Sequence, residues 1–277
     1  GKSENVSFID WVEERIETRK DIRETTRKTQ RKLVPVLREF GRISGFGDLT
    51  RVNVMKFDDF LKSKGNRQST VYSFHKFLKH YVADAVMLGL ARRNPYFGVK
   101  LDKGKSSGER FLTDSELRRI EKATMPTESI ERVRDLFLMQ CYTGLAYSDL
   151  MDFDWRRVDE ERGRMILRGC RRKTGMEFMV VLTDKALEIL ERYGYALPKI
   201  SNEQYNLRLK VVADAAGIDK PIASHWGRRT CGMYLLNHGV RMEVVSKVLG
   251  HSSIKTTEQT YARILSDTVI DAFEGMK

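Results

Sequence analysis

The spacing of hydrophobic residues predicts that roughly the first hundred residues are helical. Four apolar residues between Phe8 and Ile16 recur at helical spacing, and Ser7 in front of them fits an N-cap. A second helix is expected to begin near Thr25, with Pro35 kinking it or marking its start. The apolar sets of the second and later helices are Leu33, Leu37 and Phe40; Val54, Phe57, Phe60 and Leu61; and Val71, Phe74, Phe77, Leu78 and Tyr81.

A stretch without apolar pattern divides the chain. Residues 102–109 and the following Arg110 read DKGKSSGER, rich in Gly, Ser and Lys, which is typical of an interdomain linker. We therefore expect a helical domain over residues 1–101, a linker over 102–109 and a second domain over 110–277.

The second domain changes its hydrophobic period once. It opens with Thr113 and Glu116, which are spaced as a capping box, and a later helix should end at Gly144. Two apolar runs then flank the Lys-Thr-Gly turn of RMILRGCRRKTGMEFMVVL, which predicts a β-hairpin. The fold class is thus mainly α, with a mixed α+β second domain that contains a small antiparallel sheet or hairpin.

The remainder of the second domain is expected to be helical. Ser224 should cap a helix that stops at Gly239, and another should run over residues 241–249 and stop at Gly250. A last helix should carry Tyr261.

Composition narrows the class of protein. The 277 residues carry a net charge of +12 with a pI near 9.6, so a polyanion, with DNA or RNA foremost, is the expected partner. The three cysteines are widely spaced and the five histidines form no ligand motif, so we expect no disulfide framework, no metal and no cofactor. No apolar run reaches membrane-spanning length and no signal peptide is visible, so we expect a cytoplasmic protein. The chain begins with Gly1 rather than Met, so an N-terminal part could be missing.

A basic stripe in the first domain suits phosphate contacts. Arg15, Arg19, Arg23 and Arg27 follow a four-residue step, with Lys28 and Arg31 close by. The alternative is a solvated helix face whose arginines pair with the neighbouring acids Glu13, Glu14 and Glu17.

Five residues near the end of the chain could break and rejoin a DNA strand. They are His225 and Arg228 in SHWGRRT, His251 in LGHSS, Tyr261 in TTEQTYAR and, upstream, Lys173 in RRKTG. A tyrosine oxygen can attack a phosphodiester and conserve the bond in a protein–DNA ester. Guanidinium and imidazole groups stabilise the charged transition state, and a lysine can protonate the leaving oxygen.

Each of these residues alone has an ordinary structural explanation. His225 and Arg228 share a helix face as surface residues would, and His251 could simply sit at a helix end. Tyr261 could be a core tyrosine and Lys173 a turn lysine. Their order and spacing together favour the chemical interpretation.

The set HxxR, LGH and TTxxxY behind a KTG hairpin resembles the tyrosine recombinase, or lambda-integrase-type, family. The resemblance implies a phage-type or conjugative-transposon integrase that acts on double-stranded DNA attachment sites through a 3′-phosphotyrosyl link to Tyr261. It implies Arg228 as a motif arginine, His225 and His251 as phosphate donors or acid–base groups, and Lys173 as general acid. It also implies a helical, SAM-like core-binding domain, a dimer on each site, a tetramer on paired sites and, in some relatives, an accessory DNA-bending protein. An apolar tail with Ile264, Val269, Ile270 and Phe273 would dock on a neighbouring protomer or on its own domain.

The chain departs from the family pattern at one catalytic position. The segment TGLAYSDL has Ala146 where the family usually has arginine. Arg171 could replace it, because on a strand Arg171 and Lys173 would face one side and Arg172 the other; Arg171 could equally contact only DNA backbone. Asp149 is expected to orient neighbours, and Arg172 and Arg229 to contact DNA.

Two other functions stay open. Ala146 favours a DNA-binding relative of the same fold that cuts weakly or no longer cuts, whereas the five retained residues argue against it. A type IB topoisomerase would use the same nucleophile without exchanging partners.

Overall fold

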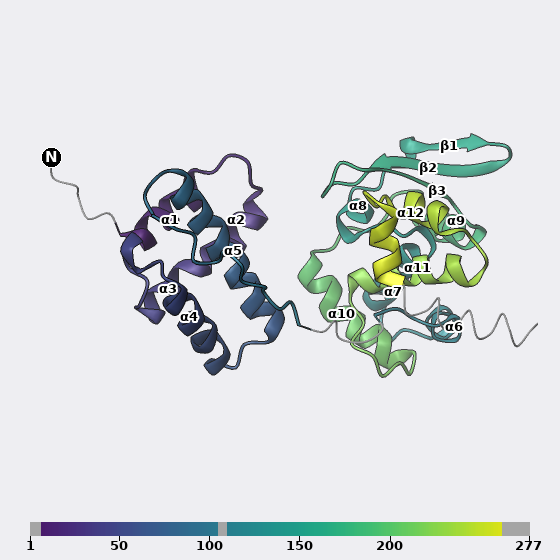
Figure 1. Cartoon of the computed structure of the whole chain (residues 1–277). Coiled ribbons are helices and arrows are strands. Elements are labelled where there is room, and N and C mark those ends of the chain that lie inside the picture. Colours follow the sequence, from purple (N-terminus) through teal and green to yellow (C-terminus); the bar gives the residue numbers. More distant parts are fainter. Residues whose placement is uncertain (1–6, 105–109, 262–277) are drawn as a thin grey trace, which may run out of the picture. The chain divides into compact units, whose positions relative to one another are not determined.

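The computed structural model describes residues 7–104 and 110–261, which belong to two units, residues 1–106 and residues 107–277. Both are mainly helical (Figure 1). None of the helices in these described stretches is long and apolar enough to cross a membrane. The expected apolar tail lies outside the described residues.

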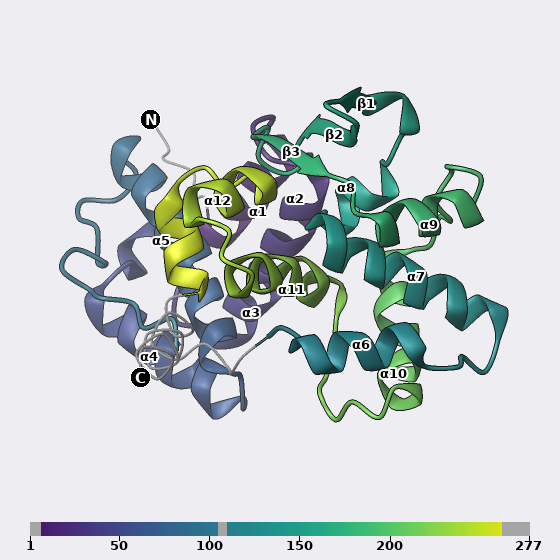
Figure 2. The same ribbon diagram turned by 90° about the vertical axis from the view of Figure 1, so that its right-hand side faces the viewer.

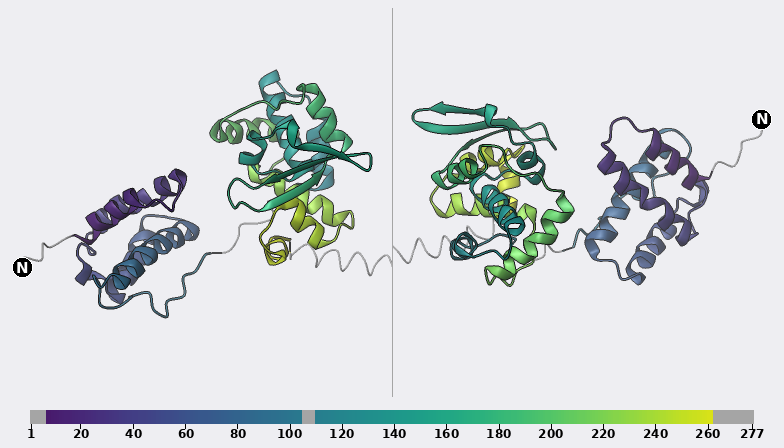
Figure 3. Two further views of the ribbon diagram at one scale, coloured as in Figure 1. Left: turned by 90° about the horizontal axis from the view of Figure 1, so that it is seen from above. Right: turned by 180° about the vertical axis from the view of Figure 1, so that it is seen from behind.

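Unit 1 contains helices only, in the part of it that is described, and they form one bundle (Figures 1 and 3). Its apolar faces meet in a core that includes Phe8, Ile16, Leu37 and Phe57. Ser7 caps the first helix as predicted, because its hydroxyl accepts from the N–H of Asp10 at 3.3 Å. The elements are α1 (Phe8–Thr18), α2 (Glu24–Arg31), α3 (Leu33–Phe40), η1 (Phe46–Asp48), α4 (Arg51–Ser63) and α5 (Gln68–Met87).

The expected second helix is in fact two helices. α2 ends at Arg31 and α3 begins at Leu33, so Pro35 lies in the first turn of α3. A proline is tolerated there because the first N–H groups of a helix have no partner within the helix. The break between the two helices falls at Lys32, a single turn residue, and not at the proline.

Unit 2 is built around α7, which contacts helices α6, α8, α9, α10 and α11. Figure 2 shows α11 beside α7, and the three strands lie together along one side of the helices in Figure 1. The helices are α6 (Asp114–Lys122), α7 (Glu128–Thr143), α8 (Tyr147–Met151), η2 (Trp155–Arg157), α9 (Asp184–Arg192), α10 (Asn202–Ala215), α11 (Ser224–Asn237), α12 (Met242–Leu249) and a last helix over residues 254–261.

The sheet confirms the predicted fold class. β1 (Val158–Glu161), β2 (Arg164–Cys170) and β3 (Glu177–Val181) are antiparallel in the order β1-β2-β3. Cys170 pairs with Glu177, so residues 171–176 form the turn of the second hairpin. β3 packs on α12, and this contact brings the turn toward the end of that helix.

The ends of the helices in unit 2 follow most of the sequence signals. The capping box of Thr113 and Glu116 is formed, and Gly144 ends α7 in the left-handed conformation at φ +68°. Gly250 ends α12 in the same way. The prediction for Ser224 was wrong: Ala223 is the N-cap and Ser224 is the first residue of α11.

Two glycines with the same backbone conformation test how tightly the end of α7 is packed. Gly144 and Gly163 have φ of +68° and +69°. A Cβ on Gly144 would lie 2.6 Å from Leu249 Cδ2 and 3.3 Å from Cys231 Sγ, whereas one on Gly163 would meet nothing within 4 Å. We expect Gly163→Ala to lower the free energy of unfolding by about 1 kcal/mol, from backbone strain alone. Gly144→Ala should cost about 1–3 kcal/mol more, from overpacking.

Urea denaturation followed by tryptophan fluorescence measures both costs. A Trp11→Phe background leaves tryptophans in unit 2 only, so the signal reports that unit. Equal destabilisation by the two alanines would contradict the close packing at Gly144.

Candidate active site

Helix α11 presents the predicted His225 and Arg228 because its other face is pressed onto α7. A Cβ on Gly227 would lie 2.7 Å from Gln140 Cβ and 3.3 Å from the Phe137 carbonyl oxygen, so only glycine allows this approach. Trp226 is buried in the same core. The packing fixes the rotation of α11 and therefore the direction of the polar residues on its free side.

The Arg228 guanidinium joins the ends of two helices. Its Nη1 donates to the Gly144 carbonyl oxygen at 2.7 Å, and its Nη2 donates to the Leu249 carbonyl oxygen. Carbonyls at helix C-termini lack partners within the helix and carry partial negative charge, so a cation suits them. Burial, and then the positive charge of Arg171, lower the pKa of Arg228 to about 10. The group therefore stays charged at neutral pH.

Arg171 lies beside Arg228 although it comes from the hairpin. It is buried, and its Nη1 is 2.5 Å from Asp149 Oδ2. A Cβ on Gly250 would lie 2.9 Å from Arg171 Cγ, so the glycine that ends α12 also leaves room for this side chain. Burial lowers the pKa of Arg171, and the charge of Asp149 opposes that effect.

Asp149 holds the start of the hairpin turn, as its expected orienting part requires. Besides pairing with Arg171, it accepts from the backbone N–H of Arg172 at 3.0 Å. Asp149 lies in α8, whose N-cap is Ala146. The guanidinium of Arg171 thus reaches the same short helix that begins at the alanine.

The argument that placed Arg171 and Lys173 on one face of a strand was wrong. β2 ends at Cys170, so Arg171, Arg172 and Lys173 all belong to the turn. Arg171 is buried because the turn folds against Asp149, whereas Lys173 is exposed and makes no ion pair within residues 7–104 and 110–261. Arg172 is exposed as well, with Nη1 3.9 Å from Asp152.

His251 follows Gly250 and faces the two arginines. Its Nδ1 is 2.7 Å from Thr257 Oγ1, and its backbone N–H donates to the Ser246 carbonyl oxygen at 3.0 Å. Burial, with the charges of Arg228 and Arg171, lowers the pKa of His251 to about 4. The imidazole is therefore neutral at physiological pH, with Nε2 available for another partner.

Tyr261 is buried against α11. Its side chain is 2% exposed and packs with Met233, Val245 and Leu249. A Cβ on Gly232 would lie 2.0 Å from the Tyr261 hydroxyl oxygen, so the hydroxyl occupies a space that only glycine leaves open. Burial raises the pKa of Tyr261, and the charge of Arg228 opposes the rise. The phenol is thus protonated in this conformation.

Four of the six predicted catalytic residues lie around Arg228. The charges of Arg171 and Tyr261 act on Arg228, and Arg228 and Arg171 act on His251, so we call Arg171, Arg228, His251 and Tyr261 the central cluster. His225 is exposed, and its pKa is lowered by burial of part of the ring and by Arg229 and Arg110. Lys173 lies in the exposed turn and is not part of the central cluster.

The basic stripe of unit 1 is not one helix face, because the chain leaves the helix between α1 and α2. Arg27 turns back to cap the end of α1, donating to the carbonyl oxygens of Glu17 at 2.6 Å and Arg19 at 2.7 Å. Arg31 pairs with Glu17 at 2.7 Å, as the alternative of a paired face predicted.

The other stripe residues differ from one another in their partners. Arg19 pairs with Asp21, and Arg15 lies 3.5 Å from Asp84. Arg23 and Lys28 are exposed and have no ion pair among the residues that the structure describes. These two side chains are thus the stripe residues whose charge is least engaged within the chain.

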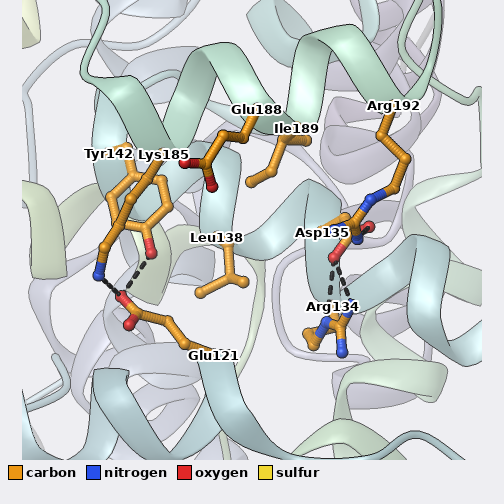
Figure 4. A pocket seen from close by; sticks show the side chains of 9 residues that line it. All are labelled: Glu121, Arg134, Asp135, Leu138, Tyr142, Lys185, Glu188, Ile189 and Arg192. Atoms are coloured by element: carbon orange, nitrogen blue, oxygen red, sulfur yellow. Dashed lines mark hydrogen bonds and ion pairs between the residues drawn. The ribbon is translucent and has the colours of Figure 1, made fainter.

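A hollow of about 170 Å³ between α6, α7 and α9 contains none of the predicted site residues (Figure 4). Its charges are largely paired with one another. Glu121 accepts from the Tyr142 hydroxyl at 2.5 Å and from Lys185 at 2.6 Å, and Asp135 accepts from Arg192 at 2.7 Å. This network joins the three helices and leaves little charge for a ligand. In the described ranges no group of three His, Cys, Asp or Glu side chains could hold a metal ion.

Sequence reasoning missed several residues that shape the site. Gly227 and Gly232 both lie inside α11, where a glycine lowers the stability of the helix by about 1 kcal/mol relative to alanine. A glycine at such a position indicates close packing against a neighbour, and this signal was available in the sequence. Thr257 was part of the TTxxxY motif, but its contact with His251 could not be read from spacing. Arg110 was predicted only as the first residue of the second domain, although its charge acts on His225 and Arg229.

Both units of the chain are similar to known proteins. The chain matches the phage integrase family over residues 110–267 and the phage integrase SAM-like domain over residues 7–103. Among curated proteins it is 24% identical to the tyrosine recombinase XerD of Oceanobacillus iheyensis, an alignment that covers 86% of this chain and 86% of the relative.

Three solved structures share the fold. A lambda integrase dimer bound to a COC′ core site has a TM-score of 0.77 at 15% identity, covering 92% of this chain and 95% of the other. The Tn1549 transposon integrase in complex with circular intermediate DNA gives 0.72 at 17%, covering 92% and 95%. A lambda integrase tetramer bound to a Holliday junction gives 0.75 at 17%, covering 93% and 78%.

The lowered pKa of His251 predicts a pH dependence of stability in the DNA-free protein. The unfolded chain takes up this proton near pH 6.5, whereas the folded chain takes it up only near pH 4. The contribution of His251 is therefore fully present above pH 6.5 and is lost as the pH falls toward 4. His251→Asn, whose amide can stand in for Nδ1 beside Thr257, should flatten this part of the profile.

Urea denaturation at a series of pH values, with NMR titration of the histidine rings, checks both statements. A His251 ring that titrates near pH 6.5 would contradict the burial and the charge environment described here.

Proposed function

Because the chain belongs to the phage integrase family and is a tyrosine recombinase of the lambda-integrase type, we propose that it cleaves and rejoins DNA at specific sites through a 3′-phosphotyrosyl intermediate, as the integrase of a mobile element. Residues 1–101 would be the core-DNA-binding domain and residues 110–277 the catalytic domain. The lambda and Tn1549 structures support the mobile-element role through their shared fold.

The observation that carries the proposal is the central cluster. The buried guanidinium of Arg171 and the partly buried one of Arg228 lie beside the neutral imidazole of His251, and the charge of Arg228 also acts on Tyr261. Two fixed cations in a partly buried site stabilise the charge that accumulates on a phosphate during attack.

Residues of this chain can account for each bond and each proton in the proposed cleavage step. The Tyr261 oxygen forms a bond to phosphorus while the bond from phosphorus to the 5′ oxygen breaks, and the 5′ oxygen takes a proton from Lys173. The phenol proton passes to a neutral imidazole, His251 or His225. Rejoining is the reverse: a 5′ hydroxyl attacks the phosphotyrosyl ester and releases Tyr261. Because the ester conserves the bond energy, rejoining needs no external energy source.

Arg171 is proposed to replace the arginine that Ala146 lacks. It is buried next to Arg228, and Asp149 fixes its position through the 2.5 Å contact. An arginine that only touched DNA backbone would be expected on the surface, as Arg172 is. Its place in the central cluster therefore favours a part in the reaction over simple backbone contact.

Double-stranded DNA is the proposed partner, and the charge of +12 supports it. We propose backbone contacts through Arg172 and Arg229 in unit 2, and through Arg23 and Lys28 in unit 1. Arg15, Arg19, Arg27 and Arg31 belong to the proposed DNA surface as well, although their ion pairs and capping bonds reduce the charge that they offer.

The assembly is proposed to be a dimer on each site and a tetramer on paired sites. The lambda integrase dimer on a core site and the tetramer on a Holliday junction share the fold of this chain. An accessory DNA-bending protein would help to bring the two sites together. Strand exchange itself requires two sites in one complex, which the tetramer provides.

Covalent trapping on nicked attachment-core DNA tests the reaction. Wild-type protein should form a protein–DNA adduct that resists denaturation, and Tyr261→Phe should lose it while still binding the same DNA, because the nucleophilic oxygen is gone. Wild-type protein that binds tightly without any adduct would favour the non-cutting relative. Relaxation of supercoiled plasmid without exchange of partners would favour the topoisomerase.

Arg171→Ala tests the displaced arginine. We expect the adduct to form roughly 100- to 1,000-fold more slowly, which is the usual loss when one fixed donor to a transition state is removed. Arg172→Ala is the matched control, because it removes the next arginine of the same turn, which is exposed. An adduct rate for Arg171→Ala equal to that for Arg172→Ala would exclude Arg171 from the reaction.

A further inference from the structure

Helix α8 carries the residue that fixes Arg171, yet the helix is too short to be stable by itself. It spans five residues, Tyr147–Met151, and Asp149 in its middle pairs with Arg171 and accepts from the backbone N–H of Arg172. Its N-cap, Ala146, makes no side-chain capping hydrogen bond. Because a helix of so few residues is unstable in isolation, the position of α8 depends on contacts from the rest of unit 2.

The chain segment before α10 holds both ends of α8. At the first residue of the helix, the half-buried Tyr147 donates from its hydroxyl to the Ile200 carbonyl oxygen at 2.5 Å. At the last residue, the Met151 carbonyl oxygen accepts from Lys199 Nζ at 2.5 Å. Two consecutive residues, Lys199 and Ile200, thus fasten the helix at its start and at its end.

A buried polar network fixes the turn that leads into α8. Gln140, on α7, donates from Nε2 to the Leu145 carbonyl oxygen at 3.0 Å, and its Oε1 accepts from the Tyr205 hydroxyl at 2.8 Å. Both Gln140 and Tyr205 are completely buried. The Tyr205 ring also packs against the Tyr147 ring, with centroids 5.8 Å apart. Tyr205 therefore supports both the turn before α8 and the first residue of the helix.

We infer that Tyr147 and Lys199 are positioning residues for Arg171 in the proposed reaction. An arginine at position 146 would project directly from the start of α8, whereas Arg171 comes from the hairpin turn and is tied to α8 through Asp149. The place of this guanidinium thus follows the place of α8. A misplacement of about 1 Å at a reacting group can slow a reaction about 100-fold. This inference rests on the proposed function, in which Arg171 stabilises the transition state.

Tyr147 and Asp149 use different sides of α8. Side chains two positions apart on an α-helix diverge by about 200°, so the side that is bonded to Ile200 is nearly opposite the side that holds Arg171. The backbone of one short helix links the two contacts. Removing the Tyr147 hydroxyl should therefore move Arg171 without removing any group that contacts it.

Tyr147→Phe tests the inference, because it removes the hydroxyl and keeps the ring. On nicked attachment-core DNA, we expect single-turnover adduct formation to slow about 10- to 100-fold, with the dissociation constant for that DNA unchanged. In an Arg171→Ala background the same substitution should have no further effect, because the residue through which it acts is absent.

Tyr193→Phe is the matched control. It removes another half-buried phenol hydroxyl of unit 2, which donates to Asp135 Oδ2 at 2.9 Å. An adduct rate for Tyr147→Phe equal to that for Tyr193→Phe would overturn the inference. An equal loss of rate from Tyr147→Phe with and without Arg171 would overturn it as well.

Arginine side-chain NMR of the DNA-free protein separates this inference from the proposed chemistry. The Arg171 guanidinium is buried and paired with Asp149, so its N–H signals should be protected from exchange with water and absent in Arg171→Ala. They should broaden or disappear in Tyr147→Phe and remain in Tyr193→Phe. Unchanged signals in Tyr147→Phe would overturn the inference, whether or not the wild-type protein forms an adduct. The expected signals without any wild-type adduct would support the positioning and count against the chemistry alone.

Lys199→Ala provides a second route if Tyr147→Phe folds poorly. Lys199 is exposed, so its loss frees the Met151 carbonyl without changing the core. We expect a loss of adduct rate smaller than that of Tyr147→Phe and again absent in the Arg171→Ala background. Lys210→Ala is the control, because Lys210 is an exposed lysine of α10 without an ion pair among the described residues. Equal adduct rates for the two lysine variants would overturn the inference.

Discussion

The two hydrogen bonds of the Arg228 guanidinium hold the site together. Three segments that are far apart in the sequence meet at this group: α11 supplies the arginine, the end of α7 supplies the Gly144 carbonyl, and the end of α12 supplies the Leu249 carbonyl. Because both carbonyls lie at helix C-termini, the guanidinium satisfies groups that would otherwise lack partners. A residue proposed to take part in the chemistry therefore also cross-links three segments of unit 2.

The helix ends themselves depend on glycine. Gly144 and Gly250 both take a left-handed conformation, and each lies where a side chain would strike a neighbour: Leu249 in one case and Arg171 in the other. The same two glycines thus stop the helices, expose the carbonyls and leave space for the second guanidinium. Arg171 can reach the site from the hairpin only because position 250 has no Cβ.

Much of this arrangement could be predicted from the sequence, where the signal is local. The capping box, the helix stops at Gly144 and Gly250 and the hairpin were all legible, because each depends on residues within a few positions of one another. The prediction of one basic stripe was wrong because its residues make contacts between segments that are separated by a turn. Arg27 donates hydrogen bonds to carbonyls at the end of α1. The periodicity of the sequence does not reveal this contact, because a turn separates Arg27 from α1.

The sequence also did not predict which side chains from distant segments would meet. Alternation along a strand suggested Arg171 as the replacement arginine for a reason that does not hold, since the turn begins at that position. What brings Arg171 inward is Asp149, which lies in helix α8, outside the hairpin. The backbone N–H of Leu112 likewise meets the Thr230 hydroxyl of α11 across more than a hundred residues.

The packing of Tyr261 against Gly232 has a consequence for how the protein would act on DNA other than its own site. For the proposed nucleophile, burial and protonation keep the phenol unreactive in this conformation. Attack on a phosphate would require the Tyr261 side chain to leave the space over Gly232 that its hydroxyl occupies. In such a protein, discrimination against the wrong DNA would not depend on base contacts alone. A buried nucleophile would also limit cleavage at sites that do not release it.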